Sequence, residues 1–304
     1  MRNKLVIGVD LGGTNITAGQ VTRQGKVLKV ETRPTLAREG KEKVLSRIKE
    51  LIGLLMTDQV IGIGIGSPGP LSSSRGIVYN PPNLPGWKNV PLRRILSRKF
   101  KLPVILENDA NAACFGEKWV GRGKGVKSLI CLTLGTGIGG GIILENKLIR
   151  GLDDTAAEIG HMTIDPDGPV CGCGNRGCLE SFSSATALVK RARERGANFL
   201  SARYIYEAAR KGDRLAKELL EETGRYLGIG IATLVNLLNP EMVVLCGRMA
   251  KAKEFIFGPI HEEIKKRSFA VPARRVKIRT SSLGEYAGLI GAAGLVWTET
   301  KLFR

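Results

Sequence analysis

Two segments of the sequence follow the same plan, and this repeat constrains the fold more than any other feature. Each consists of an apolar strand, a glycine-containing turn and a second strand, at residues 5–21 and 128–144. At a constant offset, Leu11 corresponds to Leu134 and Gly12 to Gly135. Because similar hairpins begin each half of the chain, we predict two related domains. The alternative is a chance similarity of two strand–turn–strand units.

Strand and helix patterns alternate along the rest of the chain. Apolar runs predict buried strands at 60–65, 104–106 and 242–246. Helical spacing predicts helices at 44–55, 110–120, 185–195, 200–211, 215–238 and 287–297. This alternation predicts an α/β architecture with largely parallel or mixed sheets. A chain of 304 residues is long enough for two cores. We place one domain at 1–110, completed by a C-terminal helix at about 292–304, and a larger one at 111–291.

The composition excludes several classes of protein. Hydrophobic residues make up 43% of the chain, and no apolar run reaches the ~18 residues of a membrane span. The N-terminus lacks a signal-peptide pattern, so we expect a cytoplasmic protein with no membrane partner. The net charge of +19 permits a nucleic-acid interpretation, but only residues 265–267 and 274–279 are densely basic. We therefore expect solvated basic faces and no DNA partner.

The glycine turns do not match the standard nucleotide motifs. Gly121–Ser128 has Val126 where a P-loop needs its second glycine. Gly135–Gly140 has the letters of the dinucleotide fingerprint but is followed by a strand instead of a helix. Turns without Cβ atoms nevertheless let consecutive backbone N–H groups approach an anion.

Asp10 makes phosphate chemistry the favoured interpretation of these turns. It ends an apolar strand beside the first turn, where a carboxylate can hold Mg²⁺ or its waters. The predicted phosphate-binding and Mg²⁺-binding residues are Asp10, Gly12, Gly13, Thr14, Gly135, Thr136 and Gly137. The alternative is a pair of tight hairpin turns with Asp10 as a turn former.

A cluster of polar residues follows the strand at 104–106. Glu107, Asn108, Asp109 and Asn111 lie at the strand end, where α/β sheets bind ligands. A carboxylate at this point could accept the proton of a hydroxyl group that attacks phosphorus. The alternative is a helix start with Asp109 as the N-cap.

Three of the six cysteines lie within eight residues, and their spacing indicates a metal site. Cys171, Cys173 and Cys178 follow His161, and together they form a Cys₃His set suited to tetrahedral zinc. With all four positions filled by protein, the ion would be structural. The alternative is a glycine loop with unliganded thiols. The remaining cysteines, Cys114, Cys131 and Cys246, are predicted to be buried thiols.

Taken together, these motifs resemble the ROK family (repressors, open reading frames and kinases). The resemblance rests on residues 10–14, 82–87, 107–113, 134–141, 158–161, 171–180 and 283–293. It implies an actin-like ATPase fold, an RNase H-like duplication whose two domains close over a cleft. It also implies that a zinc loop spans 161–180.

The resemblance implies a role for each matching residue. It implies an ATP- and Mg²⁺-dependent hexose kinase of carbohydrate metabolism, in which Asp109 is the general base. The implied sugar contacts are Asn83, Asn108, Asp109, Glu158, His161 and Glu180. His161 would bind zinc through one nitrogen and the sugar through the other. The nucleotide would lie against both glycine turns and Gly247, which follows Cys246 where the family often has a glycine.

Members of this family differ in substrate and in activity. Residues 82–87 with the complete zinc loop are most similar to those of glucokinases, which act on the 6-hydroxyl group of glucose. Kinases of N-acetylglucosamine or N-acetylmannosamine are the alternative. Family repressors carry an added N-terminal helix-turn-helix, and Asp10 comes too early to leave room for one, so a regulator without kinase activity is disfavoured. A homodimer or higher homo-oligomer is expected from the family alone.

Overall fold

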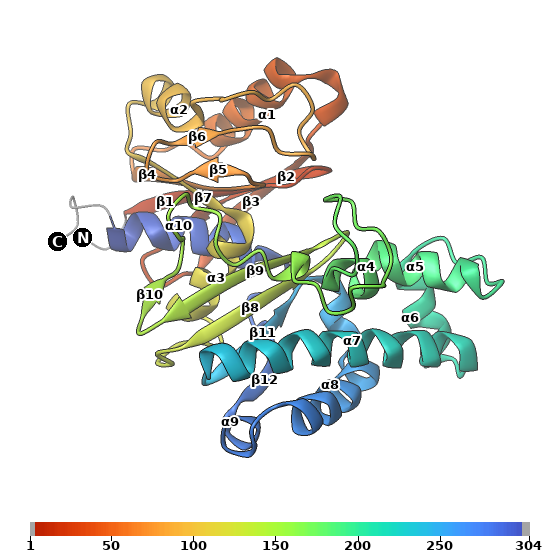
Figure 1. Cartoon of the computed structure of the whole chain (residues 1–304). Coiled ribbons are helices and arrows are strands. Elements are labelled where there is room, and N and C mark those ends of the chain that lie inside the picture. The colour runs from red at the N-terminus through yellow and green to blue at the C-terminus, as the bar shows by residue number, and fades with distance from the viewer. Residues whose placement is uncertain (1–3, 300–304) are drawn as a thin grey trace. The chain divides into compact units, whose positions relative to one another are not determined.

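The computed structural model describes residues 4–299 of the chain. Its strands are β1 (Leu5–Leu11), β2 (Asn15–Val21), β3 (Val27–Pro34), β4 (Val60–Ser67), β5 (Leu71–Ser72), β6 (Ile77–Val78), β7 (Val104–Asn108), β8 (Leu129–Leu134), β9 (Ile138–Leu144), β10 (Lys147–Leu148), β11 (Met242–Cys246) and β12 (Lys277–Thr280). Its α-helices are α1 (Lys41–Leu54), α2 (Leu92–Phe100), α3 (Asp109–Trp119), α4 (Leu179–Ser183), α5 (Ala185–Glu194), α6 (Ala202–Arg210), α7 (Arg214–Leu238), α8 (Lys253–Arg267), α9 (Ala270–Arg275) and α10 (Ala287–Glu299). The 3₁₀ helices are η1 (Ala37–Glu39), η2 (Ile159–His161), η3 (Arg248–Ala252) and η4 (Gly284–Tyr286) (Figure 1). None of the helices within 4–299 has the length and apolar character needed to span a bilayer.

The chain forms two compact units, each built on a five-stranded sheet. Of the described residues, the first unit contains 4–125, 148–156 and 282–299, and the second contains 126–147 and 157–281. The sheet orders are β3-β2-β1-β4-β7 and β10-β9-β8-β11-β12. In each, the first strand of a glycine hairpin pairs antiparallel with the second strand and parallel with the next strand of the sheet. The duplication predicted from the repeat is therefore present as two sheets of the same order.

The boundaries of the units differ from those expected. We expected the first domain to end at residue 110, but α3 belongs to the first unit because it packs against α10. A Cβ atom on Gly291 of α10 would lie 1.6 Å from the carbonyl oxygen of Ala112, so the two backbones touch. The expected C-terminal helix at 292–304 corresponds to α10, and residues 300–304 lie outside the described part of the chain.

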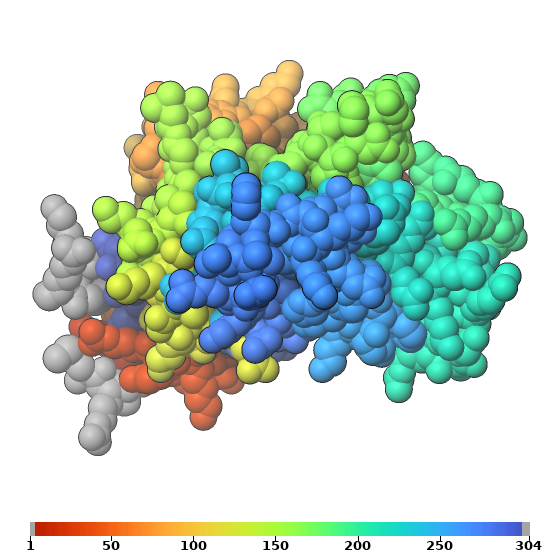
Figure 2. All heavy atoms as spheres, turned by 60° about the horizontal axis from the view of Figure 1, so that its bottom comes forward, coloured from red at the N-terminus to blue at the C-terminus, as the bar shows by residue number. Residues whose placement is uncertain are grey.

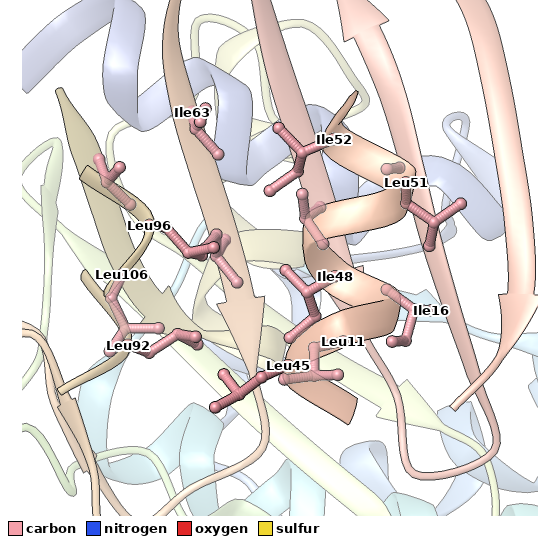
Figure 3. Close-up of a cluster of buried hydrophobic side chains, with 14 of the residues drawn as sticks. Leu11, Ile16, Leu45, Ile48, Leu51, Ile52, Ile63, Leu92, Leu96 and Leu106 are labelled. Carbon is pink, nitrogen blue, oxygen red and sulfur yellow. The ribbon is translucent and has the colours of Figure 1, made fainter. Parts of the chain in front are cut away.

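The sheet of the first unit is covered on both faces. On one face, the apolar side of α1 and the leucines of α2 pack against β1, β2, β4 and β7, as Figure 3 shows. On the other face, α10 contributes Leu289, Ala293 and Val296 to a second cluster. A Cβ atom on Gly64 of β4 would lie 1.9 Å from the carbonyl oxygen of Ala292. This close packing fixes the strands whose ends carry the candidate site.

The densely basic run lies on the surface of the second unit. Its cations occupy exposed positions on α8, α9 and β12: Lys265, Lys266, Arg267, Arg274, Arg275, Lys277 and Arg279. The blue surface in Figure 2 contains these elements. Within α8, Arg267 pairs with the mostly buried Glu263 one helical turn earlier. The other charges are spread over three elements and face solvent, as expected for solvated faces.

Candidate active site

Three parallel strands of the first unit end in register at the candidate site. Asp10 of β1 pairs with Gly66 of β4, and Gly66 pairs with Glu107 of β7. The next residues of β7 and α3 are Asn108 and Asp109, and a Cβ atom on Gly66 would lie 3.3 Å from the Cα of Asp109. Asp10 and Asp109 therefore lie at the same carboxyl edge of the sheet, the edge where α/β proteins bind ligands.

Asn108, and not Asp109, is the N-cap of α3. The extended backbone of Asn108 lets its Oδ1 accept hydrogen bonds from the amides of Ala110, at 2.9 Å, and Asn111, at 3.1 Å. The interpretation of Asp109 as the cap was thus wrong by one position. Asp109 is half-buried, and its Oδ1 accepts the N–H of Ala110 at 2.8 Å. Because the cap uses Oδ1 of Asn108, the Nδ2 group is the part of that amide left to donate to a ligand.

The first glycine turn is held from behind by a buried threonine. The hydroxyl group of Thr35 donates to the carbonyl oxygen of Gly12 at 2.6 Å, and its amide donates to the carbonyl oxygen of Thr14 at 2.8 Å. Since a trans peptide directs its C=O and N–H in opposite directions, the amide of Gly13 points away from Thr35. A Cβ atom on Gly13 would lie 3.0 Å from the Cβ of Asn83, so Asn83 lies directly beside this turn.

The second glycine turn is held in the same way. The amide of Ala185 donates to the carbonyl oxygen of Gly135 at 2.9 Å. The hydroxyl group of Thr186 donates to the carbonyl oxygen of Thr136 at 2.8 Å. The amides of Thr136 and Gly137 therefore point away from α5, side by side, as in an anion-binding nest. Gly247, at φ 86°, completes this edge, because a Cβ atom there would lie 2.4 Å from the carbonyl oxygen of Leu134.

Glu180 connects the second turn to the cysteine loop. Its Oε2 accepts the amide of Ile138, the first residue of β9, at 2.7 Å. A Cβ atom on Gly137 would lie 2.3 Å from the same oxygen, which explains why glycine occupies this position. The other oxygen, Oε1, lies 3.9 Å from the Sγ of Cys171. Glu180 thus has one oxygen bound to the turn and one on the side of the cysteine loop.

The predicted metal ligands converge on one point. One ligand atom from each of His161, Cys171, Cys173 and Cys178 lies within 4.8 Å of the other three. The Nδ1 of His161 is 3.8 Å from the Sγ of Cys171, and the Sγ atoms of Cys173 and Cys178 are 3.7 Å apart. Four ligands about 2.3 Å from a tetrahedral zinc ion lie about 3.8 Å from one another, so the donors have the spacing of a zinc site.

The predicted residues fall into two groups, one on each unit. The first unit brings together Asp10, Gly12, Gly13, Thr14, Asn83, Asn108 and Asp109. The second unit carries Gly135, Thr136, Gly137, Glu158, His161, Glu180, Gly247 and the three cysteines. Glu158 is exposed at the start of η2, and η2 is held against β9 because Gly160 has no side chain.

The ROK family model matches residues 6–299. The chain belongs to the ROK family. A glucokinase of Thermotoga maritima is 41% identical over 96% of both chains. A xylose repressor of Caldicellulosiruptor bescii is 37% identical over 98% of this chain and 79% of the repressor. The sequence is therefore similar both to an enzyme and to a regulator.

A solved structure of a ROK family glucokinase from Streptomyces griseus, in complex with glucose and AMPPNP, has a similar fold. Its TM-score is 0.84 and its identity 36%, and the match covers 96% of this chain and 98% of that one. The actin-like ATPase fold expected from the resemblance is thus confirmed, with two units built on sheets of the same order. Sequence reasoning missed Thr35 and Thr186, because nothing near them in the sequence shows that they hold the turns of a ROK protein.

Proposed function

We propose that the chain is an ATP-dependent glucokinase that transfers the γ-phosphoryl group of ATP to the 6-hydroxyl group of glucose. The observation that carries this proposal is the nearly full-length similarity to glucokinases, one of them a complex with glucose and an analogue of ATP. The position of Asp10 and Asp109 at the carboxyl edge of the first sheet supports the proposal, because α/β proteins bind ligands at this edge.

Asp109 is the proposed general base. Its carboxylate follows β7 directly and starts α3, so the helix start and the sheet fix its position. It would accept the proton of the sugar hydroxyl group as the oxygen attacks phosphorus. In the first unit, Asn83 and Asn108 are proposed to bind sugar hydroxyl groups beside Asp109. In the second unit, Glu158, His161 and Glu180 are the proposed sugar-binding residues. Hydrogen-bonding groups that a bound sugar buries discriminate against sugars that leave them unpaired.

The two turns are the proposed phosphate-binding elements. The amide of Gly13 points away from Thr35, and those of Thr136 and Gly137 point away from Ala185 and Thr186, so they can donate to phosphate oxygens. Gly12, Gly135 and Gly247 allow close approach, and Thr14 adds a hydroxyl group. Asp10 would hold Mg²⁺, which neutralises the charge that builds up on the phosphates when it is bound.

The Cys₃His group is the proposed zinc site. His161 turns Nδ1 to the thiols, so the proton of the neutral imidazole must then reside on Nε2. Nε2 is then the ring nitrogen that can donate a hydrogen bond to a sugar hydroxyl group. A zinc ion held by these four residues would fix the orientation of the ring and of the loop that carries Glu180.

A coupled ADP-release assay tests the proposal. MgATP is supplied with glucose, N-acetylglucosamine, N-acetylmannosamine, mannose or fructose. We expect the highest kcat/KM with glucose. A preference for an acetamido sugar would keep the mechanism and change the substrate. Sugar binding without turnover would instead favour a regulator. This alternative is supported by the similarity to the xylose repressor. Homo-oligomer formation stays a prediction, to be tested by light scattering.

Replacing Asp10 with asparagine is expected to stabilise the protein in the absence of Mg²⁺. Burial raises the pKa of Asp10 from 3.8 to about 6, so between these values the folded state binds more protons than the unfolded state. Stability is then lost as the pH rises from about 4 to about 6, by up to ~3 kcal/mol. A neutral amide at this position would avoid the loss.

Chemical unfolding at two pH values measures the effect. At about pH 7.5 the D10N variant should exceed the parent in free energy of unfolding, and at about pH 4 the difference should vanish. The exposed Asp58→Asn serves as the control. An equal difference at both pH values would contradict the assignment. Turnover of the D10N variant should fall sharply, because an amide is a poor ligand for Mg²⁺.

Replacing Gly137 with alanine is expected to weaken nucleotide use. The added methyl group would force Glu180 to give up its hydrogen bond to the amide of Ile138. Losing a charged hydrogen bond of this kind corresponds to a fall in kcat/KM for ATP of about 10-fold or more. Gly53→Ala on α1, with no atom within 4 Å of the added Cβ, is the control that should keep parental kinetics. Parental kinetics in the G137A variant would refute this role of the turn.

A further inference from the structure

Glu107 is a buried carboxylate to which no function has yet been given. Only 1% of its surface is exposed. Its Oε1 accepts the backbone amide of Asn108 at 2.9 Å and the Nδ2 of Asn111 at 3.1 Å. These two donors lie on either side of Asp109 in the sequence, so one oxygen atom holds the chain just before and just after the proposed base.

The other oxygen of Glu107 is paired with an arginine from a distant part of the chain. The Nε of Arg150 donates to Oε2 of Glu107 at 2.6 Å. Arg150 lies in the segment 148–156, which belongs to the first unit although the chain on both sides of it belongs to the second. Its Nη2 also donates to Glu299 of α10 at 2.9 Å.

The segment that carries Arg150 is itself fixed to the first unit. The carboxylate of Asp154 accepts hydrogen bonds from the hydroxyl groups of Ser72 and Ser73 and from the amide of Ser73, at 2.6–3.1 Å. The carbonyl oxygen of Arg150 accepts the amide of Ala156 at 3.0 Å. Arg150 therefore reaches Glu107 from a backbone that is held at both ends.

We propose that Glu107 and Arg150 are positioning residues that set the start of α3, and with it Asp109, for phosphoryl transfer. The inference rests on the proposed kinase function and extends it to two residues that do not touch the substrate. Without the guanidinium group, this almost fully buried carboxylate would keep two neutral donors, the Asn108 amide and the Nδ2 of Asn111. A buried charge without a charged partner rearranges toward water, and this change loosens the bond of the carboxylate to the Asn108 amide.

Burial lowers the pKa of Arg150, but the charges of Glu107 and Glu299 and the hydrogen bonds to them raise it above its ordinary value. The guanidinium group thus stays charged throughout the working range of pH. Its planar shape also directs Nε to one carboxylate and Nη2 to the other, a fork that a lysine cannot reproduce. We therefore expect Arg150→Lys to restore only part of the function of the pair.

The experiment compares variants of Arg150 and its two partners in the full chain. Arg150→Met keeps the length of the side chain and removes the charge. Its kcat for glucose phosphorylation should fall about 10- to 100-fold, the usual effect of a misplaced catalytic group, with the KM for ATP changed less than about twofold. The kcat of Glu107→Gln should fall by a similar factor, because the NH₂ group of the new amide would face the Nε donor of Arg150. The double variant should lose little more than either single one, since the pair acts as a unit.

Two controls separate positioning from stability. Glu299→Gln removes the other partner of Arg150 and should keep kcat within about twofold of the parent. Arg47→Met removes the ion pair between Arg47 and Glu50 and should also keep kcat. It is a matched control because the Arg47 side chain is 28% exposed and that of Arg150 is 27% exposed. All rates are measured well below the melting temperature of each variant.

Hydrogen exchange at the Asn108 amide gives a readout that does not depend on turnover. Exchange should be faster in Arg150→Met than in the parent and unchanged in Glu299→Gln. A parent without turnover on any hexose would refute the proposed function, and the exchange rates would still decide whether Arg150 holds the start of α3. Parental kcat and parental exchange in Arg150→Met would overturn the inference, even if that variant melts at a lower temperature.

Discussion

Replacing Asp109 with asparagine is expected to lower kcat for glucose phosphorylation by about 10²- to 10⁴-fold, the usual contribution of a general base. The substitution keeps the shape of the side chain and an Oδ1 atom that can accept the Ala110 amide, as it does at 2.8 Å in the structure. It removes the group that takes the proton from the attacking hydroxyl group. The loss should therefore appear in kcat, while the chain still folds and still binds glucose.

The measurement combines steady-state kinetics with calorimetric binding of glucose. We expect the dissociation constant of glucose to change by less than about 10-fold, because only one of the proposed hydrogen-bonding groups is altered. The exposed Asp153→Asn is the control for loss of a carboxylate elsewhere in the first unit. A kcat within about tenfold of the parent would assign the base to another residue. A loss of glucose binding without any change in kcat would make Asp109 a binding group only.

The sequence predicts those parts of the site that are encoded locally. The four predicted metal donors lie within eighteen positions, 161–178, and glycines lie between them, so their convergence follows from a short loop. The two glycine turns are also local, because each joins adjacent strands of one hairpin. In both cases the residues that act together are neighbours in the chain, and their spacing restricts the geometry to a few arrangements.

Contacts between distant segments could not be predicted in this way. Arg150 meets Glu107 only because residues 148–156 return to the first unit, and no pattern near Arg150 indicates that path. Thr35 lies outside the first turn and looks like any residue after a strand until its two hydrogen bonds to the turn are seen. Likewise, α3 could be assigned to the first unit only from its packing on α10, which comes more than 160 residues later.

Loss of the proposed zinc ion is the second large effect expected, and replacing Cys178 with serine should produce it. Cys178 is fully buried, and its Sγ lies 3.7 Å from that of Cys173. A hydroxyl group is a poor zinc ligand, so the metal content should fall from about one zinc per chain to near none. Cys178 also directly precedes α4, which carries Glu180. Without the ion, His161 loses the partner of its Nδ1 and Glu180 loses the fixed loop that holds it.

The expected consequence is a fall in kcat/KM for glucose of about 100-fold or more, since zinc would orient two of the proposed sugar ligands together. Zinc is measured by elemental analysis and activity by the coupled assay, on protein purified under reducing conditions. Cys131→Ala removes another buried thiol of the second unit and should keep the zinc and the activity. Full zinc content in C178S would contradict the ligand assignment. A variant without zinc that keeps parental kinetics would show that the ion stabilises the loop without orienting the sugar ligands.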